Sequence, residues 1–346
     1  YKHDSSLTDQ QIETVTRWVD AGAPEGDPAN AGEPLPEVKD GLSRVDETLA
    51  LPKPYKPKKS PDDYRCFPVE WDGQNTEFVT GFGVKPDKDE IVHHVIAYLA
   101  GPSLAKEVKQ KDKAEAGPGY TCFGGPGVGN SGSAQSSVGW LGAWAPGTIG
   151  QDFPSKTGIR IEPGSTIILQ VHYTTLTTDP VEDQTEIVLK TDQQVDTEAM
   201  FVPFTNPQWI SQDGAMDIPA GLDDVEHSFS YDVASLIGSK LQIHDAFFHM
   251  HQLGKSGRLW IDRKEGDSDC LLNIPDWDFN WQRGYRLDQP ATLSPGDQLG
   301  IECSWDNSMA NQPVINGEKK SPEDVDWGEG TGDEMCLGVF YVTRGN

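Results

Sequence analysis

Five of the eight histidines in this sequence lie where they could bind a metal ion. His93 and His94 are adjacent in IVHHVIAYLA, His172 lies in LQVHYTT, and His249 and His251 form a His-x-His in FFHMHQLG. Residues two apart in a β-strand share a face, so His249 and His251 can present both imidazoles to one ion. Adjacent residues face opposite ways, so His93 and His94 need a bend in the strand to do the same. Imidazole suits both copper and zinc.

Met335, in GDEMCLGVFYV, is a candidate for a softer ligand. A thioether added to two imidazoles selects Cu(I) over zinc. Each signal also has an ordinary explanation, because methionine usually fills gaps in a core and a buried histidine is satisfied by a backbone partner. The metal interpretation therefore depends on the fold bringing these side chains together.

The elements that must position them are predicted to be β-strands. Beyond Pro61, short runs of β-branched and aromatic residues alternate with clusters of Gly, Pro, Asn and Asp, which is typical of antiparallel sandwiches. The clearest strand covers residues 166–175, with one face made by Ile167, Leu169, Val171 and Tyr173 and the other by Ile168, Gln170, His172 and Thr174. Further strands are expected at residues 91–100, 187–190, 242–250, 258–262 and 336–343. Residues 120–139 are rich in Gly and Ser and are expected to form a long loop.

The N-terminal part differs in texture. Residues 5–23 predict a helix, with Thr8 and Gln11 forming a capping box. Its apolar stripe is Ile12, Val15, Trp18 and Val19. One helix cannot bury this stripe alone, so we expect it to dock on the rest of the protein. Residues 24–60 are rich in Pro and charged residues and are expected to be an extended linker.

Composition narrows the possible partners. The chain has 346 residues, enough for two domains, and a net charge of −27, which disfavours nucleic acid and anionic membrane surfaces. No apolar run reaches membrane-spanning length. The five cysteines contain no Cys-x-x-Cys pair, and two disulfides with one remaining thiol suit a secreted or periplasmic location. The sequence begins at Tyr1 without a visible signal peptide, so we expect a mature or excised form.

Six segments between residues 54 and 343 occur in an order seen in one family. They are YRCF at 64–67, VHHVIAYL at 92–99, GAWAPG at 142–147, LQVHYTT at 169–175, HMHQLGKSGR at 249–258 and DEMC at 333–336. In these motifs the chain resembles the type II copper, ascorbate-dependent monooxygenases, which include the peptidylglycine α-hydroxylating and dopamine β-monooxygenases. The resemblance implies two tandem antiparallel jelly-roll sandwiches, at residues 54–195 and 196–346, after a helix and linker at residues 1–53.

The resemblance also implies the metal ligands. His93, His94 and His172 would hold an electron-transfer copper ion, and His249, His251 and Met335 an oxygen-binding one, across a solvent-filled cleft between the domains. It further implies two disulfides, Cys66–Cys122 and Cys303–Cys336. Cys270 has no counterpart in the family and is expected to be a buried free thiol.

The implied activity is copper-dependent hydroxylation of an aliphatic C–H bond with O2 and an external reductant. Peptidylglycine enzymes clamp a substrate carboxylate with arginine, asparagine and tyrosine, where this chain has Phe247, Leu337 and Val339. These side chains cannot form a bidentate clamp, so we expect a small neutral or aromatic substrate. Phe248 is expected in the same pocket, and Gln170 is expected either to orient His172 or to line the cleft. Arg258 or Lys255 directed at the copper ion of His249, His251 and Met335 would contradict this expectation.

The segment SLTDQQIETVTRWVDAGAPEGDP resembles the closing helix of bacterial c-type cytochrome domains. The reductant could therefore be ascorbate or a c-type haem donor, fused or separate. Two other interpretations remain open. One is a copper-binding or electron-transfer protein without oxygenase activity. The other is a zinc-supported carbohydrate-binding sandwich in which Met335 is ordinary core.

Overall fold

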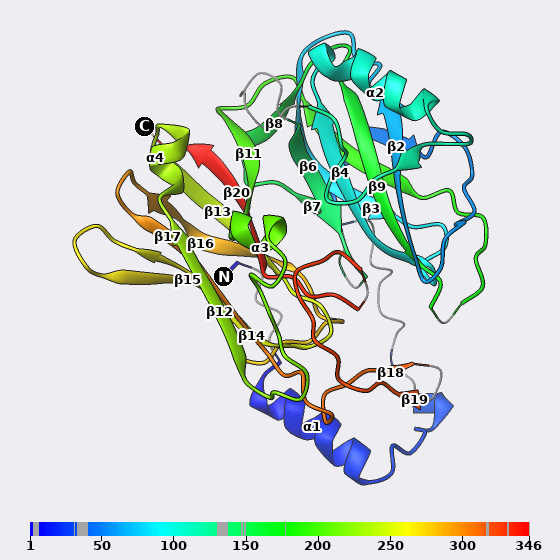
Figure 1. Ribbon diagram of the computed structural model, residues 1–346, viewed down its shortest axis with the longest axis vertical. Helices are drawn as coiled ribbons and strands as arrows, with labels where there is room; N and C mark the ends of the chain where they lie inside the picture. The colour runs from blue at the N-terminus through cyan, green and yellow to red at the C-terminus, as the bar shows by residue number, and fades with distance from the viewer. Residues whose placement is uncertain are drawn as a thin grey trace.

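The computed structural model describes residues 1–2, 7–30, 32, 41–129, 138–146, 148, 150–176, 178–315, 318–330 and 332–345. The chain is built mostly of β-strands, as predicted, with a short N-terminal helix (Figure 1). The helices are α1 (Asp9–Asp20), α2 (Ala105–Lys113), α3 (Pro207–Ser211) and α4 (Val233–Ile237), with 3-10 turns η1 (Pro28–Asn30) and η2 (Pro102–Leu104). Among the described residues, no helix combines the length and apolar character needed to span a membrane.

A long sheet runs through the whole molecule in the strand order β1-β10-β3-β8-β11-β20-β13-β16, with β7 paired to β3. Its strands are β1 (Glu47–Ala50), β10 (Glu186–Asp192), β3 (Glu77–Lys85), β8 (Thr157–Ile161), β11 (Thr197–Phe204), β20 (Leu337–Arg344), β13 (Leu241–His249), β16 (Gly284–Leu293) and β7 (Gln151–Asp152). Most of its pairs are antiparallel, but β8 and β11 form a short parallel pair at Thr157–Thr197 and Gly158–Glu198. That pair joins the two halves of the molecule.

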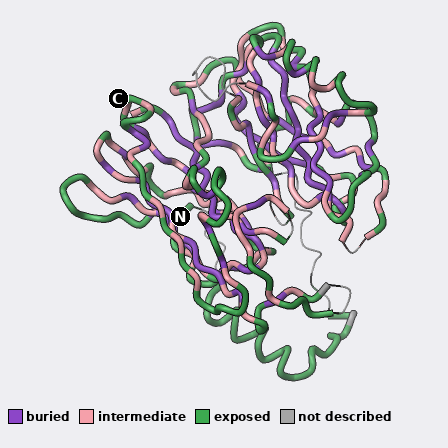
Figure 2. The backbone as a smooth tube through the Cα atoms, in the orientation of Figure 1, coloured by how far each residue is buried: buried purple, intermediate pink, exposed green. Residues whose placement is uncertain are grey.

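Each half of the long sheet is covered by its own smaller sheet. The first has the order β5-β2-β9-β4-β6, from β5 (Tyr120–Thr121), β2 (Asp62–Glu70), β9 (Thr166–Thr174), β4 (Val92–Ala100) and β6 (Gly139–Trp144). The second has the order β12-β17-β14-β15, from β12 (Val225–Tyr231), β17 (Gln298–Trp305), β14 (Gly254–Asp262) and β15 (Ser268–Ile274). A separate hairpin pairs β18 (Val314–Ile315) with β19 (Glu318–Lys319). Two apolar cores result, one in each sandwich (Figure 2).

Both faces of strand β9 are buried. Ile167, Leu169, Val171 and Tyr173 all lie in the first core, so the predicted inward face is confirmed. The opposite face is also buried, because Ile168 packs in a smaller cluster with α2 residue Val108 and the disulfide cysteines Cys66 and Cys122. A covered outer face holds His172 at 1% exposure rather than in solvent.

Helix α1 agrees with its predicted start but not with its predicted packing. Thr8 and Gln11 form the capping box. None of the twelve residues of α1, all of which lie in the described part of the chain, is buried, and Trp18 is 51% exposed. The expectation that the stripe docks on the sandwiches is therefore wrong for this structure, in which the helix lies at one end of the molecule (Figure 1).

Part of the expected linker belongs to the first sandwich. Glu47–Ala50 form β1, which pairs with β10 at the edge of the long sheet, and Leu51 is 1% exposed. Tyr55 pairs with Asp183 and lies in the first core. Residues 31 and 33–40 of the linker lie outside the described residues. The short alternation in ETLA was too brief to stand out from the surrounding Pro and charged residues.

An aromatic cluster fills the joint between the sandwiches. Tyr341 of β20 belongs to the first core although its strand lies in the second half of the sheet. Its ring lies 4.9 Å from Phe153 and 5.2 Å from Phe201, measured between centroids. Its hydroxyl lies 2.9 Å from the hydroxyl of Thr157 on β8. One side chain thus contributes apolar packing and a buried hydrogen bond where the two halves meet.

We predict that Tyr341→Ala lowers the free energy of unfolding by roughly 3–5 kcal/mol, the usual cost of deleting a buried aromatic ring. Tyr341→Phe, the matched control, removes only the hydrogen bond to Thr157 and should cost about 1 kcal/mol. Urea unfolding followed by tryptophan fluorescence measures both. Equal losses for the two variants would contradict the role given to the ring.

Candidate metal centres

A β-bulge places His93 and His94 on the same side of their strand. The pairing of β4 with β9 runs Val92–Tyr173 and then His94–His172, with a register shift between Val92 and His94. His93 is the extra residue of this irregularity. A bulge changes the direction of the side chains around it, which resolves the alternation that should have separated the two imidazoles.

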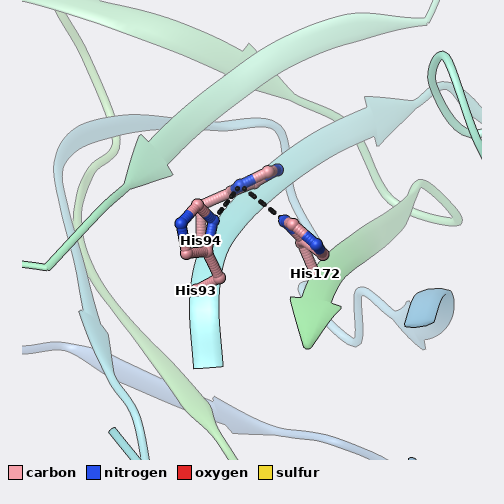
Figure 3. A group of neighbouring side chains, drawn as sticks. All are labelled: His93, His94 and His172. Atoms are coloured by element: carbon pink, nitrogen blue, oxygen red, sulfur yellow. Dashed lines mark hydrogen bonds between the residues drawn. The ribbon is translucent and has the colours of Figure 1, made fainter. Parts of the chain in front are cut away.

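Three ring nitrogens converge beside the bulge (Figure 3). The Nδ1 atom of His94 lies 3.3 Å from Nδ1 of His93 and 3.3 Å from Nδ1 of His172. The three residues can each offer one ligand atom such that all these atoms lie within 4.8 Å of one another. The three imidazoles therefore fit a single metal ion bound through ring nitrogens.

Two residues of β2 hold the His172 ring in place. The Asp62 carboxylate lies 2.8 Å from Nε2 of His172, so Nε2 carries the proton and Nδ1 keeps its lone pair for a ligand. Tyr64 stacks on the same ring at 4.0 Å between centroids and 11° between planes. Its hydroxyl donates to the carbonyl of Glu329, on the segment that leads to Met335. A carboxylate behind a ligating histidine is a common support for metal ligands.

His249 and His251 form the second group. Their ring centroids lie 5.0 Å apart. Nδ1 of His251 lies 2.8 Å from the carbonyl oxygen of Asp333, and Nδ1 of His249 lies 2.6 Å from Oε1 of Gln282. The Gln282 amide is oriented by Nε2, which donates to the carbonyl of Phe279 at 2.9 Å. Both Nδ1 atoms face acceptors, so both Nε2 atoms carry lone pairs that suit a metal ion.

A buried carboxylate connects His251 to the segment carrying Met335. Glu334 is 0% exposed, and its carboxylate accepts from the backbone N–H of His251 at 2.9 Å and of Leu253 at 2.7 Å. It also accepts from the indole N–H of Trp305 at 2.9 Å. Burial raises the pKa of Glu334 to about 7 although these donors oppose the shift. Glu334 therefore fixes the backbone of His251 from the residue next to Met335.

Met335 lies close in the chain to the strand that pairs with the His249 strand. Strands β13 and β20 pair as far as His249 with Leu337. Met335 lies two residues before the start of β20, and His251 lies two residues after the end of β13. Met335 is half-buried, and the following Cys336 is held by its disulfide.

Burial keeps the imidazoles of both groups neutral. It lowers the pKa of His93 to about 3 and holds the pKa values of His94 and His251 well below the usual value. The pKa values of His172 and His249 are also lowered by burial, partly opposed by Asp62 and Gln282 respectively. A neutral imidazole is the form that binds a metal ion, so the electrostatics suit a metal centre.

The two groups lie close together. Neighbouring imidazoles of the second group, His249 and His251, add to the lowering of the His94 pKa. Phe279 contacts both groups, stacking on His93 at 5.5 Å and lying 6.5 Å from His251 between centroids. The solvent-filled cleft implied by the resemblance stays a prediction, and the Phe279 ring lies against one histidine of each group.

Both cysteine pairs implied by the resemblance are bonded in the structure. Cys66–Cys122 ties β2 to the loop after β5, and Cys303–Cys336 ties β17 to the start of β20. Cys270 is free, but it is exposed on β15. The expectation that it is buried is wrong, because it lies on the outward side of the strand while Leu271 and Leu272 fill the core.

The expected pocket residues separate into two sets. Phe247 stacks in parallel with His249 at 6.5 Å, and it pairs across the sheet with Val339, while Leu337 pairs with His249. These three apolar residues therefore flank His249. Phe248 points into the second core at 1% exposure and packs over Gly257, so its assignment to the pocket is wrong. Alternation along β13 separates it from Phe247.

Gln170 lies away from the expected cleft. Its amide oxygen accepts from Tyr98, and its amide nitrogen lies 3.7 Å from Cys122 Sγ. It is 1% exposed, so these contacts place it in the cluster around the first disulfide.

Other candidate polar residues are engaged elsewhere. Arg258 pairs with Glu302 and Lys255 with Asp224. His227 lies 2.9 Å from the carbonyl of Asp217, and His244 lies 2.9 Å from Thr343. His3 lies outside the described residues.

Sequence reasoning missed the residues that support the histidines. Asp62, Glu334, Gln282 and Phe279 approach from strands or loops far away in the chain. Only two lay beside a recognised motif, Asp62 near YRCF and Glu334 inside DEMC. Gln282 and Phe279 had no signal in the sequence, because their loop is brought to the site by the pairing of β16 with β13.

Residues 215–343 match the family model described as copper type II ascorbate-dependent monooxygenase, C-terminal domain. Among solved structures, the major capsid protein P2 of bacteriophage PM2 aligns at a TM-score of 0.32 and 11% identity, covering 87% of this chain and 98% of that one. A score this low supports no shared fold.

Curated relatives align with most of the chain. DBH-like monooxygenase protein 1 of Gallus gallus is 23% identical over 281 residues, which cover 76% of this chain and 41% of that protein. Putative DBH-like monooxygenase protein 2 of Homo sapiens is 24% identical over 266 residues, which cover 74% of this chain and 48% of that protein. The chain thus spans less than half the length of these relatives. Residues 215–343 are therefore similar to a copper type II ascorbate-dependent monooxygenase domain, and most of the chain is similar to these DBH-like monooxygenase proteins.

Proposed function

We propose that this protein is a copper-dependent monooxygenase that hydroxylates an aliphatic C–H bond of a small substrate with O2 and an external reductant. The observation that carries the proposal is the pair of histidine groups, buried at His172 and His251 and half-buried at His93, His94 and His249. In the second group and at His172, an oxygen acceptor holds one ring nitrogen and leaves the other as a ligand. Bound copper would supply one-electron and dioxygen chemistry that no side chain provides.

The proposed ligands form two sets, one ion each. His93, His94 and His172 would bind one copper through Nδ1, the atoms that converge at the bulge. His249 and His251 would bind the other through Nε2, together with the sulfur of Met335. A thioether beside two imidazoles favours Cu(I), the state that reacts with dioxygen. Asp62, Gln282 and Glu334 would orient these ligands.

The residues beside His249 favour a neutral or aromatic substrate. Phe247, Leu337 and Val339 offer only apolar surface there. Arg258 and Lys255, the cations nearest in sequence after the His-x-His motif, are paired with carboxylates on β17 and near β12. Apolar side chains offer neither a hydrogen bond nor an opposite charge. The carboxylate of a substrate bound beside them would therefore have no partner.

The same proposal includes the organisation of the chain. Residues 54–195, together with β1 at Glu47–Ala50, and residues 196–346 would be two tandem jelly-roll domains, each carrying one copper. The two disulfides are compatible with a secreted or periplasmic location. The reductant would be ascorbate or a c-type haem protein, and the N-terminal segment before β1, which contains α1, would be the region that such a donor adjoins.

We predict two copper ions per chain in protein reconstituted with copper and dialysed. His172→Ala should lose one ion and His249→Ala the other, because each substitution removes a ligand of a different group. Copper content measured by atomic emission checks this. His227→Ala, a histidine outside both groups, should retain two ions.

Activity is tested with the copper-loaded protein, a reductant and a panel of neutral and aromatic small molecules under ¹⁸O₂. Mass spectrometry should find one ¹⁸O atom in a hydroxylated product, and the His249→Ala variant should give none. Reduction and reoxidation of two bound coppers without an oxygenated product from any panel member would instead support an electron-transfer protein.

The supporting residues should act on their own centres only. Asp62→Ala should weaken copper binding at the His172 group by about 10- to 100-fold, because the ring loses the acceptor that fixes its tautomer. Gln282→Ala should do the same at the His249 group. Competition with a chelator measures both affinities, and each variant is the control for the other. Equal weakening of both centres by either variant would contradict this assignment.

The pH dependence of the stability of the metal-free protein should reflect the lowered pKa of His94. The pKa of His94 in the folded protein lies well below that of an unfolded histidine. Below pH 6.5 the unfolded chain therefore binds a proton at His94 that the folded protein does not bind. This contribution to stability is present above pH 6.5 and is lost as the pH falls toward the folded pKa. The difference in the free energy of unfolding between the parent and His94→Gln should therefore become smaller as the pH falls below 6.5, by at most about 1.4 kcal/mol per pH unit. Urea unfolding at pH 8, 6 and 5 checks this, and a constant difference would refute it.

A further inference from the structure

The loop of residues 275–283 between β15 and β16, here called the strap loop, contacts both histidine groups. Its Phe279 ring stacks on His93 with 24° between planes, and lies nearly perpendicular to His251 at 86°. His93 belongs to β4 in the first sandwich and His251 follows β13 in the second. One side chain of the strap loop therefore touches both groups.

The strap loop is anchored on either side of Phe279. On one side, the Trp277 indole donates to the carbonyl of His251 at 3.0 Å, and its backbone N–H donates to the carbonyl of Lys255 at 2.9 Å. The Trp277 ring also packs over Gly254, where an added Cβ would lie 2.5 Å from the ring. On the other side, Gln282 is 6% exposed and binds both His249 and the Phe279 carbonyl.

These anchors all belong to the second sandwich. The position of the Phe279 ring is therefore fixed relative to His249 and His251, and His93 packs against a surface that the second sandwich provides. A ring held from one side and stacked on the other sets how closely the two groups approach.

We propose that Phe279 is a positioning residue that sets the separation of the two metal centres, through its ring packed against both His93 and His251. The inference rests on the proposed function, because it requires a copper ion in each group. Phe279 is not a ligand. Its removal should change the relation between the centres while leaving each centre intact.

The test uses the full chain loaded with two Cu(II) ions and measures the distance between them by pulsed electron paramagnetic resonance. Phe279→Ala should retain two ions per chain and unchanged spectra of the separate centres. Its distance distribution should lose the parent's short component and extend to longer distances. Phe279→Tyr, which keeps the ring, should restore the parent distribution, and Trp281→Ala on the same loop, where Trp281 is 62% exposed, should match the parent.

The possible outcomes separate the two proposals. If the parent protein fails to bind two ions at these histidines, the proposed function falls and this inference falls with it. If the parent binds two ions and Phe279→Ala keeps the parent distance distribution, only the inference is overturned. Phe279→Leu, which retains apolar bulk, replaces Phe279→Ala if the latter does not fold, and it should show the same change because it lacks the flat ring.

Discussion

A buried imidazole must remain neutral and must give its single N–H to an acceptor, and much of this site follows from that constraint. Burial lowers the pKa values of all five histidines of the two groups. At His172, His249 and His251 the acceptors are Asp62, Gln282 and the carbonyl of Asp333. Satisfying one nitrogen with an oxygen leaves the other as a lone-pair donor. The demands of burial and the demands of metal binding thus coincide.

The long sheet explains how distant segments meet with this accuracy. Its strands β13 and β20 carry His249 and lead to Met335, while β8 and β11 connect the halves through two paired positions. The Cys303–Cys336 disulfide holds the start of β20 to the smaller sheet, and Glu334 holds the backbone at His251. The second group is therefore built on paired strands, a covalent bond and a buried carboxylate, which together limit its movement.

The contacts between the sandwiches concern function as much as stability. Tyr341 and its aromatic neighbours close the joint at one place, and Phe279 packs against one histidine of each group at another. Tyr64 adds a third connection, since it stacks on His172 and donates to Glu329 near Met335. Each links residues of one sandwich to residues of the other. The spacing of the two proposed centres is thus a property of the whole molecule.

The sequence by itself determined the strands and the candidate ligands, because alternation of apolar residues and the spacing of histidines are local patterns. The two faces of β9 could be read directly from residues 166–174. Tertiary structure decided what depends on non-local pairing. The bulge at His93, the exposed positions of α1 and Cys270, and the core position of Phe248 are examples. Asp62, Gln282 and Phe279 meet the histidines only through strand register and loop packing, which no local pattern encodes.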